Sequence, residues 1–194
     1  MAINTELGMS VADFVRLYDS EGPFELIDGE RVPLSPNVFG PIYFANRIAR
    51  PLDDYSAPRS LGQAFVEATF ILTPADNPNW VKGSRVPDVS FYRAERLAAY
   101  IATQPEWEAR PLALVPDLAV EVVSPTDAYA DVLRKARLYR QDGVRLIWVV
   151  EPSERVITIY APDSEQQTTL TGDDRLTAAD LLPGFDISIA QLFA

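Results

Sequence analysis

Apolar residues recur at helical spacing in two stretches of the N-terminal half. The first stretch predicts a short amphipathic helix that follows Ser10, whose hydroxyl suits an N-cap. Its apolar positions are Val11, Phe14, Val15 and Tyr18. The second stretch, from residue 37 to about residue 55, predicts a longer helix with Pro41 near its start and Pro51 near its end. Its apolar positions are Ile42, Ala45, Ile48, Ala49 and Leu52.

Other segments are rich in β-forming residues and predict strands. Residues 24–34 predict a hairpin, because Asp28-Gly29 is a typical two-residue turn between apolar flanks. Residues 63–73 predict one strand, and 86–92 predict a short strand after a turn region rich in proline and asparagine. Further strands are expected at 116–123, 144–152, 154–162 and 166–172.

The helix predicted most strongly lies between residues 124 and 143. Ser124 suits its N-cap, Pro125 its first position, Asp127 the capping box and Gly143 its C-terminal end. With the strands on either side, this helix has the length of a βαβ crossover, so we expect those two strands to be parallel. The pattern predicts an α/β fold in which helices cover a central mixed sheet. At 194 residues, one domain over residues 1–194 is expected.

Composition narrows the chemistry, because the chain contains neither histidine nor cysteine. Thiolate nucleophiles and histidine-based triads are excluded, and zinc is disfavoured because it prefers sulfur and imidazole ligands. Carboxylates suit hard cations such as Mg²⁺ or Mn²⁺. A hydrolytic site would therefore combine carboxylates, such a cation and an assisting lysine.

The net charge of −11 argues against broad binding to nucleic acid, which relies on basic side chains that neutralise phosphates. Two segments are nevertheless locally basic, one around residues 82–96 and one around 134–140. No apolar run is long enough to span a membrane, and no signal-like N-terminal segment is found, so a cytoplasmic location is expected.

Two carboxylates lie in segments that predict buried strands. Glu121 interrupts the otherwise apolar strand 116–123, and an unpaired buried charge costs several kcal/mol, so a cation, a partner or a cleft is expected beside it. The alternative is a salt bridge to a buried arginine, but Glu121 lies at the C-terminal end of its strand, where open α/β sheets tend to place their sites. Asp88 has a similar position in 86–92, although an aspartate after proline is also typical of a turn. Asp117 shares a face with Glu121 but lies about 13 Å away along an extended strand, so it is interpreted as structural.

Lys135 is one of only two lysines in this arginine-rich chain. A lysine ammonium is a compact charge whose protonation can be tuned at a reacting centre. Its spacing from Asp127 and Asp131 also fits an exposed stripe of salt bridges. However, Lys135 borders apolar positions of the helix that follows the Glu121 strand. A serine–lysine hydrolase based on Ser124 is a weaker reading, because an N-cap role explains that serine.

Together, several segments resemble the Uma-type restriction endonuclease family, a branch of the PD-(D/E)XK nuclease superfamily. They follow the family's order over nearly the whole chain: FELIDGE, RVPDVSF, PDLAVEVVSP, the lysine and tyrosine of KARLY, GVRLIWVVEP and LPGFDISIAQLF. The resemblance implies a restriction endonuclease-like fold. It also implies Mg²⁺-dependent (or Mn²⁺-dependent) hydrolysis of phosphodiester bonds, with nucleic acid, and DNA in particular, as the partner.

The same resemblance assigns roles to individual residues. Asp88 and Glu121 are implied as metal ligands and catalytic residues, and Glu25 as a further acidic ligand. Val123 occupies the position where the superfamily has its lysine, so Lys135 on the following helix is implied to supply the amine. Tyr139, one helical turn later, is a candidate to support Lys135.

Two functional hypotheses remain open from the sequence. One is an active endonuclease that acts as a homodimer, because two related sites can cut both strands of a duplex. The other is a catalytically inactive module that keeps the fold in order to bind a partner protein or nucleic acid. The acidity and the valine at position 123 favour the second hypothesis, and the retained Asp88, Glu121 and Lys135 favour the first.

Overall fold

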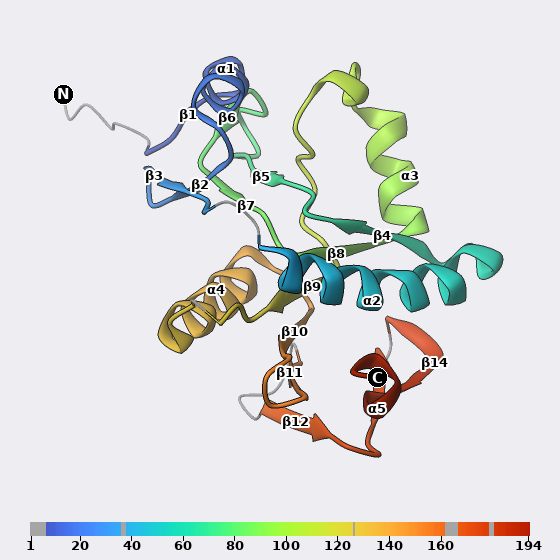
Figure 1. The fold of residues 1–194 in the computed structure, drawn as a ribbon. Helices are drawn as coiled ribbons and strands as arrows, with labels where there is room; N and C mark the ends of the chain where they lie inside the picture. Colours follow the sequence, from blue (N-terminus) through green and yellow to red (C-terminus); the bar gives the residue numbers. More distant parts are fainter. Residues whose placement is uncertain (1–6, 36–37, 126, 162–166, 179–180) are drawn as a thin grey trace. The chain divides into compact units, whose positions relative to one another are not determined.

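The computed structural model describes residues 7–35, 38–125, 127–161, 167–178 and 181–194 (Figure 1). The chain forms two compact units, each built from segments that are separate in the sequence. The first contains residues 1–36, 69–86 and 101–115, and the second contains 37–68, 87–100 and 116–194. The expected single domain over 1–194 stays a prediction.

The first unit contains a small sheet with strand order β3-β2-β7-β5, a two-stranded β1-β6 pair and one α-helix. Its elements are β1 (Met9–Ser10), α1 (Val11–Glu21), β2 (Phe24–Ile27), β3 (Glu30–Pro33), β5 (Phe70–Leu72), β6 (Trp80–Val81), β7 (Gly83–Arg85) and the 3₁₀ turn η2 (Trp107–Ala109). Its core consists of Phe14, Phe24, Leu26, Ile71 and Val81.

Two N-terminal predictions are confirmed in this unit. Ser10 caps α1, since its hydroxyl oxygen accepts a hydrogen bond from the N–H of Asp13 at 3.0 Å. Strands β2 and β3 form the expected antiparallel hairpin. Both turn residues have positive φ, 51° at Asp28 and 82° at Gly29, as the right-handed twist of a tight hairpin requires.

The second unit contains a six-stranded mixed sheet with the order β12-β11-β10-β9-β8-β4. Its strands are β4 (Gly62–Val66), β8 (Val89–Arg93), β9 (Leu118–Val122), β10 (Leu146–Glu151), β11 (Val156–Tyr160), β12 (Gln167–Thr171) and the separate pair β13 (Arg175–Ala178) and β14 (Leu182–Ser188). Its helices are α2 (Phe39–Ser56), η1 (Ala57–Arg59), α4 (Tyr129–Asp142) and α5 (Ile189–Leu192). Helix α3 (Ala94–Thr103) contributes residues to both units.

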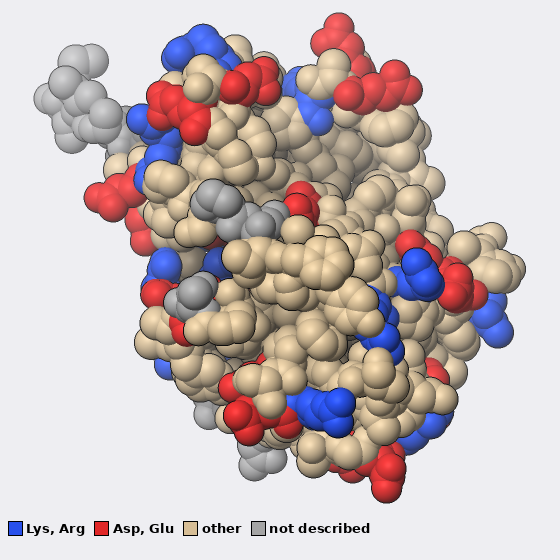
Figure 2. All heavy atoms as spheres, in the orientation of Figure 1, with Lys and Arg blue, Asp and Glu red and all other residues tan. Residues whose placement is uncertain are grey.

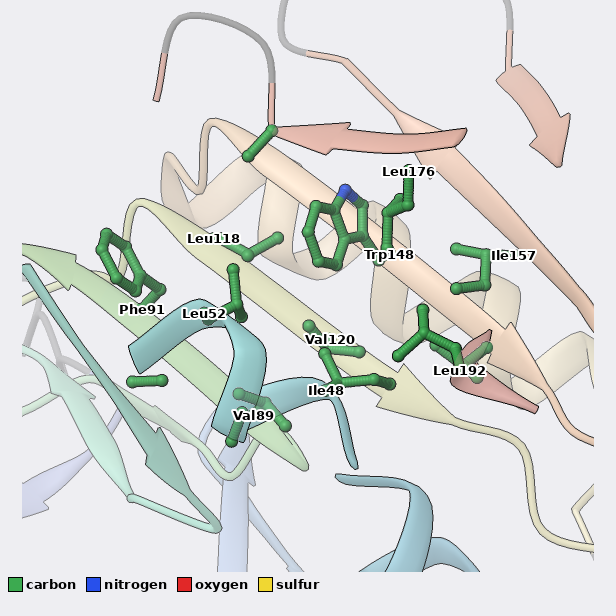
Figure 3. Close-up of a cluster of buried hydrophobic side chains, with 14 of the residues drawn as sticks. Ile48, Leu52, Val89, Phe91, Leu118, Val120, Trp148, Ile157, Leu176 and Leu192 are labelled. Carbon is green, nitrogen blue, oxygen red and sulfur yellow. The ribbon is translucent and has the colours of Figure 1, made fainter. Parts of the chain in front are cut away.

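Strands β9 and β10 are parallel and are joined through α4, which confirms the predicted crossover. The expected α/β architecture, a mixed sheet flanked by helices, is therefore present. One face of the sheet packs against α2, with Ile48 and Leu52 of the helix beside Val89 and Val120 of the strands (Figure 3). Burial of these side chains supplies most of the driving force that fixes α2 on this face.

Two boundaries differ from the sequence prediction. The single strand expected at 63–73 is two strands, β4 and β5, which belong to different sheets. The break falls at Glu67, whose φ of 53° lies in the left-handed region and cannot continue a strand.

The second difference is the start of α4, which begins at Tyr129 with Ala128 as its N-cap instead of following Ser124. Asp127 instead forms a turn with Ser124: its carboxylate accepts from the Ser124 N–H at 2.9 Å, and its own N–H donates to the Ser124 carbonyl at 3.0 Å. These bonds satisfy the local backbone outside the helix, so the predicted capping role of Ser124 was wrong. The predicted end at Gly143 is correct, because this residue has a φ of 96° and caps the helix.

Candidate active site

The second face of the large sheet carries the candidate site. Along β9, Leu118, Val120 and Val122 enter the core beneath α2, so alternation directs Glu121 to the opposite face. There α4 buries Val132, Ala136 and Tyr139. Charged side chains of β9 and α4 thus meet where the helix packs on the sheet, among mostly apolar residues.

Glu121 is bound by two side chains of α4. Lys135 donates a hydrogen bond from its ammonium nitrogen to Oε2 of Glu121 at 3.0 Å, and the Tyr139 hydroxyl donates to Oε1. Only 7% of the Glu121 side chain is exposed, compared with 27% of the Lys135 side chain. Lysine and tyrosine lie four residues apart, one helical turn, and so reach the two oxygens of one carboxylate.

Asp88 lies directly before β8, close to the end of β9. Strands β8 and β9 are antiparallel, with Val89 paired to Val120, so Asp88 follows the last pair of this ladder on the side towards Glu121. Oδ2 of Asp88 accepts a hydrogen bond from the N–H of Val122 at 2.6 Å, which fixes the carboxylate beside the strand end. The structure thus brings the two predicted carboxylates to neighbouring positions.

The environment of Asp88 disfavours its negative charge. Burial and the nearby charge of Glu121 raise the pKa of the Asp88 carboxyl to about 7. The Val122 hydrogen bond and the Lys135 ammonium oppose this shift, whereas the charge of Glu67 adds to it. Side-by-side carboxylates of this kind are stabilised by a bound cation, which offsets their mutual repulsion.

The donor set is compatible with a magnesium-type cation. Mg²⁺ is commonly held by one or two carboxylates, while waters and substrate phosphates complete its octahedral shell. Asp88 and Glu121 supply that number of carboxylates. Within the described parts of the chain, no three acidic side chains converge closely enough to enclose an ion by themselves.

Glu25, the third ligand expected from the sequence, lies in β2 of the first unit. Its carboxylate is buried and accepts a hydrogen bond from the N–H of Val86 at 3.0 Å. Its assignment as a metal ligand stays a prediction.

Asp117 has a structural role, as the strand geometry predicted. It is buried, with Oδ2 accepting from the Arg93 N–H at 3.0 Å and from the Arg96 guanidinium at 2.9 Å. The arginine salt bridge that the sequence left as an alternative for Glu121 is formed by Asp117 instead, with an Arg96 side chain that is 38% exposed.

The sequence analysis missed Glu67 as a neighbour of the site. The strand pattern placed it inside an uninterrupted strand, but it follows β4 directly and its N–H donates to the Asp88 carbonyl at 3.1 Å. No local pattern singles out this residue, because its position depends on the pairing of β4 with β8.

Residues 11–190 match the Uma2 family, described as "Putative restriction endonuclease". The chain belongs to the Uma2 family. This match confirms the resemblance drawn from the sequence segments and makes a nuclease the function class of the Uma2 chain.

A solved structure supports the same fold. A crystal structure of a "putative nuclease" of DUF820 from Anabaena variabilis ATCC 29413 aligns with a TM-score of 0.74 and 20% identity, over 95% of the Uma2 chain and 97% of its own. A cryo-EM structure of a DrdV–DNA complex aligns with a TM-score of 0.31 and 12% identity, over 66% of this chain and 12% of its own, which is too weak for any inference. No protein of curated function matches the Uma2 chain significantly.

No α-helix in the described residues has the length and hydropathy needed to cross a membrane. The face drawn in Figure 2 carries basic and acidic side chains interspersed over its described surface.

Proposed function

We propose that this chain is a divalent-cation-dependent endonuclease that hydrolyses DNA phosphodiester bonds at the Asp88–Glu121 pair. The observation that carries the proposal is the Lys135 ammonium, 3.0 Å from the carboxylate of Glu121, whose neighbour Val122 donates its N–H to the Asp88 carboxylate at 2.6 Å. Two carboxylates and an amine at one strand end are the residue types that phosphodiester hydrolysis by this superfamily uses. The family membership over residues 11–190 supports the same chemistry.

Asp88 and Glu121 would hold Mg²⁺ or Mn²⁺. When bound, such a cation offsets the negative charge that accumulates on the phosphate oxygens during hydrolysis. The carboxylates contribute by being fixed in advance, Asp88 through the Val122 N–H and Glu121 through Lys135 and Tyr139. A fixed donor set loses little entropy when it binds its ion.

Lys135 would orient the attacking water or stabilise charge on the phosphate. Its ammonium has three donors, so one can bind Glu121 while another is directed to water or substrate. The side chain is partly exposed, which keeps it accessible to a substrate. The amine thus reaches the site from α4, while Val123 fills the sequence position where the superfamily has its lysine.

The direct test is cleavage of supercoiled plasmid DNA by the purified protein with Mg²⁺, with Mn²⁺ and with EDTA. We expect relaxed or linear products that depend on the cation, and at least a hundredfold loss of rate in Glu121→Gln. Glu151→Gln, a half-buried carboxylate at the end of β10, is the matched control and should cleave like the wild type. Equal cleavage by Glu121→Gln and the control would refute the assignment.

A second candidate function is a binding module without catalysis. The net charge of −11 and the valine at position 123 favour it. A binding module would cleave neither single-stranded DNA, double-stranded DNA nor RNA, whether Mg²⁺ or Mn²⁺ is present. It would still bind its partner. The cleavage assay therefore separates the two functions.

We also propose that the active form is a homodimer, because two symmetry-related sites are suited to cutting both strands of a duplex. Sedimentation equilibrium with and without duplex DNA would measure the assembly, and a monomer on DNA would contradict the proposal. Cytoplasmic location stays a prediction.

A further inference from the structure

The first turns of α2 carry exposed aromatic side chains. Phe39 is 77% exposed and Tyr43 is 43% exposed, and one helical turn separates them, so they lie on the same side of the helix. Their ring centroids are 6.1 Å apart. The start of α2 lies on the face drawn in Figure 2, where its surface is uncharged. Adjoining exposed apolar side chains of this size are typical of interaction sites.

The rings are held in place by the residues around them. Tyr43 contacts Phe44 edge to face, with centroids 5.3 Å apart, and the Phe44 ring lies 5.7 Å from that of the buried Phe193. Arg47 donates to the Tyr43 hydroxyl at 3.0 Å and to the Gln191 carbonyl at 2.6 Å. The Arg47 guanidinium also lies 5.7 Å from the centre of the Tyr43 ring. Side chains fixed in this way lose little entropy when a ligand covers them.

The charge of this part of α2 is positive, in contrast to that of the whole chain. Residues 37–52 contain two arginines, Arg47 and Arg50, and no acidic residue, although the net charge of the chain is −11. The arginines continue the row of Phe39 and Tyr43 at spacings of four and three residues. Proteins bind single-stranded nucleic acid with this combination, because aromatic rings stack on bases and basic groups neutralise phosphates.

The row lies at the end of the large sheet that carries the candidate site. In Figure 3, Leu52 of α2 lies beside Leu118 of β9. One helical turn nearer to the start of α2, Ile48 lies beside Val120. The helix therefore runs antiparallel to β9, and its first turns lie towards the strand end that carries Glu121.

We infer that Phe39, Tyr43, Arg47 and Arg50 form a binding surface for single-stranded DNA. The two rings stack on unpaired bases, and the two arginines bind the flanking phosphates. The inference rests on the proposed function in taking DNA as the substrate, and it narrows that substrate to DNA that is single-stranded or locally unpaired. Bases inside an intact duplex stack on one another and leave no face open to a side chain.

Phosphates complement this row better than a second copy of the chain does. A symmetric dimer brings the same patch of both copies together, so an interface through this row would place arginines against arginines. A DNA strand instead supplies one negative charge with each base, at the spacing of its own backbone.

The test measures binding of a fluorescein-labelled oligothymidylate by fluorescence anisotropy in EDTA, in which a cation-dependent enzyme cleaves nothing. Phe39→Ala and Tyr43→Ala should each weaken the Kd about tenfold, because each removes one stacking contact. Phe39→Tyr keeps a ring and should bind within about twofold of the wild type, which separates lost stacking from lost folding. The matched control is Trp107→Ala in the first unit, where a ring that is 41% exposed should be dispensable.

Arg50→Gln tests the phosphate contact separately. Loss of one contact should reduce the slope of log Kd against log salt concentration by about 0.7, the value for one phosphate of a single strand. Arg145→Gln, an exposed arginine directly before β10, is the matched control and should leave the slope unchanged.

The outcomes distinguish this inference from the proposed function. An unchanged Kd in both alanine variants would overturn the inference, whereas cation-dependent plasmid cleavage by the wild type would still support the function. Weaker binding in both, with unchanged controls, supports the inference even for a wild type that cleaves no DNA. Failure of the wild type to bind the oligothymidylate would overturn the inference. Dissociation of a wild-type dimer by Phe39→Ala, with oligothymidylate binding unchanged, would assign the row to a second copy and overturn it as well.

Discussion

Lys135 on α4 and Glu121 on β9 lie fourteen positions apart in the chain, yet their ammonium and carboxylate groups are 3.0 Å apart. The crossover from β9 through α4 to β10 creates this contact, since it returns the helix across the face to which Glu121 points. Tyr139 binds the other oxygen of the same carboxylate. An acid on a strand is thereby fixed by two residues of the helix that follows it.

Replacement of Lys135 by methionine should abolish cleavage while leaving the cation bound. Methionine has similar length and no charge, so we expect a loss of at least a hundredfold in cleavage rate. Mn²⁺ affinity should not fall, because the variant removes a positive charge near the ion. The matched control is Arg145→Met, an exposed cation at the start of the β10 segment. Cleavage by Lys135→Met at the control rate would show that the amine has no part in the reaction.

Replacement of Tyr139 by phenylalanine removes one hydrogen bond to Glu121 and little volume. Loss of a buried hydrogen bond to a charged acceptor should cost about 1–3 kcal/mol of unfolding free energy. Less precise positioning of Glu121 should also slow cleavage about tenfold. Urea denaturation and the plasmid assay measure the two effects.

The matched control for Tyr139 is Tyr160→Phe. The Tyr160 hydroxyl is buried without a hydrogen-bond partner in the described structure, so its removal should leave stability unchanged or slightly raised. Equal destabilisation by both variants would mean that the Tyr139 hydroxyl contributes through packing alone.

Asp88 should make the metal-free protein less stable as the pH rises. Its pKa is about 7 in the folded protein against 3.8 for an ordinary aspartate, so the folded state binds more protons between these values. Stability is then lost from about pH 4 to pH 7. In EDTA at pH 8, the unfolding free energy of Asp88→Asn should be about 1–3 kcal/mol higher than that of the wild type, after allowance for solvent screening. Near pH 4 the two proteins should have nearly the same unfolding free energy.

Asp13→Asn provides a control of opposite sign. The Ser10 hydroxyl and the Arg16 guanidinium lower the pKa of Asp13, so the charge of Asp13 favours the folded state. Asp13→Asn should therefore be no more stable than the wild type at pH 8. A stability gain for Asp88→Asn that is equal at pH 4 and pH 8 would contradict the raised pKa.

Asp117 should matter for stability and not for the cation. Asp117→Asn weakens the buried contacts with Arg93 and Arg96, and we expect a loss of about 1–3 kcal/mol in unfolding free energy. Mn²⁺ affinity, measured by calorimetry on the folded variant, should stay within twofold of the wild type. A large loss of affinity would assign Asp117 to the site.

Local sequence patterns predicted most of the elements correctly. The alternation in 116–123 identified the buried strand and the face of Glu121, because side-chain direction follows directly from position along a strand. The Asp28-Gly29 turn and the Ser10 cap were equally local, since each depends on a few adjacent residues.

The sequence by itself determined the chemistry that this protein can use. Without histidine or cysteine, a hydrolytic site is restricted to carboxylates, hydroxyls and amines, and the order of segments identified the family. Asp88, Glu121 and Lys135 were candidates because their residue types are unusual in their local surroundings. The residue types and their short-range spacing can be read directly from the sequence.

Only the tertiary structure decided which of these groups lie together. The pairing of β4 with β8 brought the Glu67 N–H to the Asp88 carbonyl, β4 and β5 joined different sheets, and the buried Asp117 carboxylate paired with Arg96 of α3. The start of α4 likewise followed from hydrogen bonds of Asp127 that compete with helix capping. Pairing between strands joins residues distant in the chain, and its energy depends on the whole sheet and on no single segment.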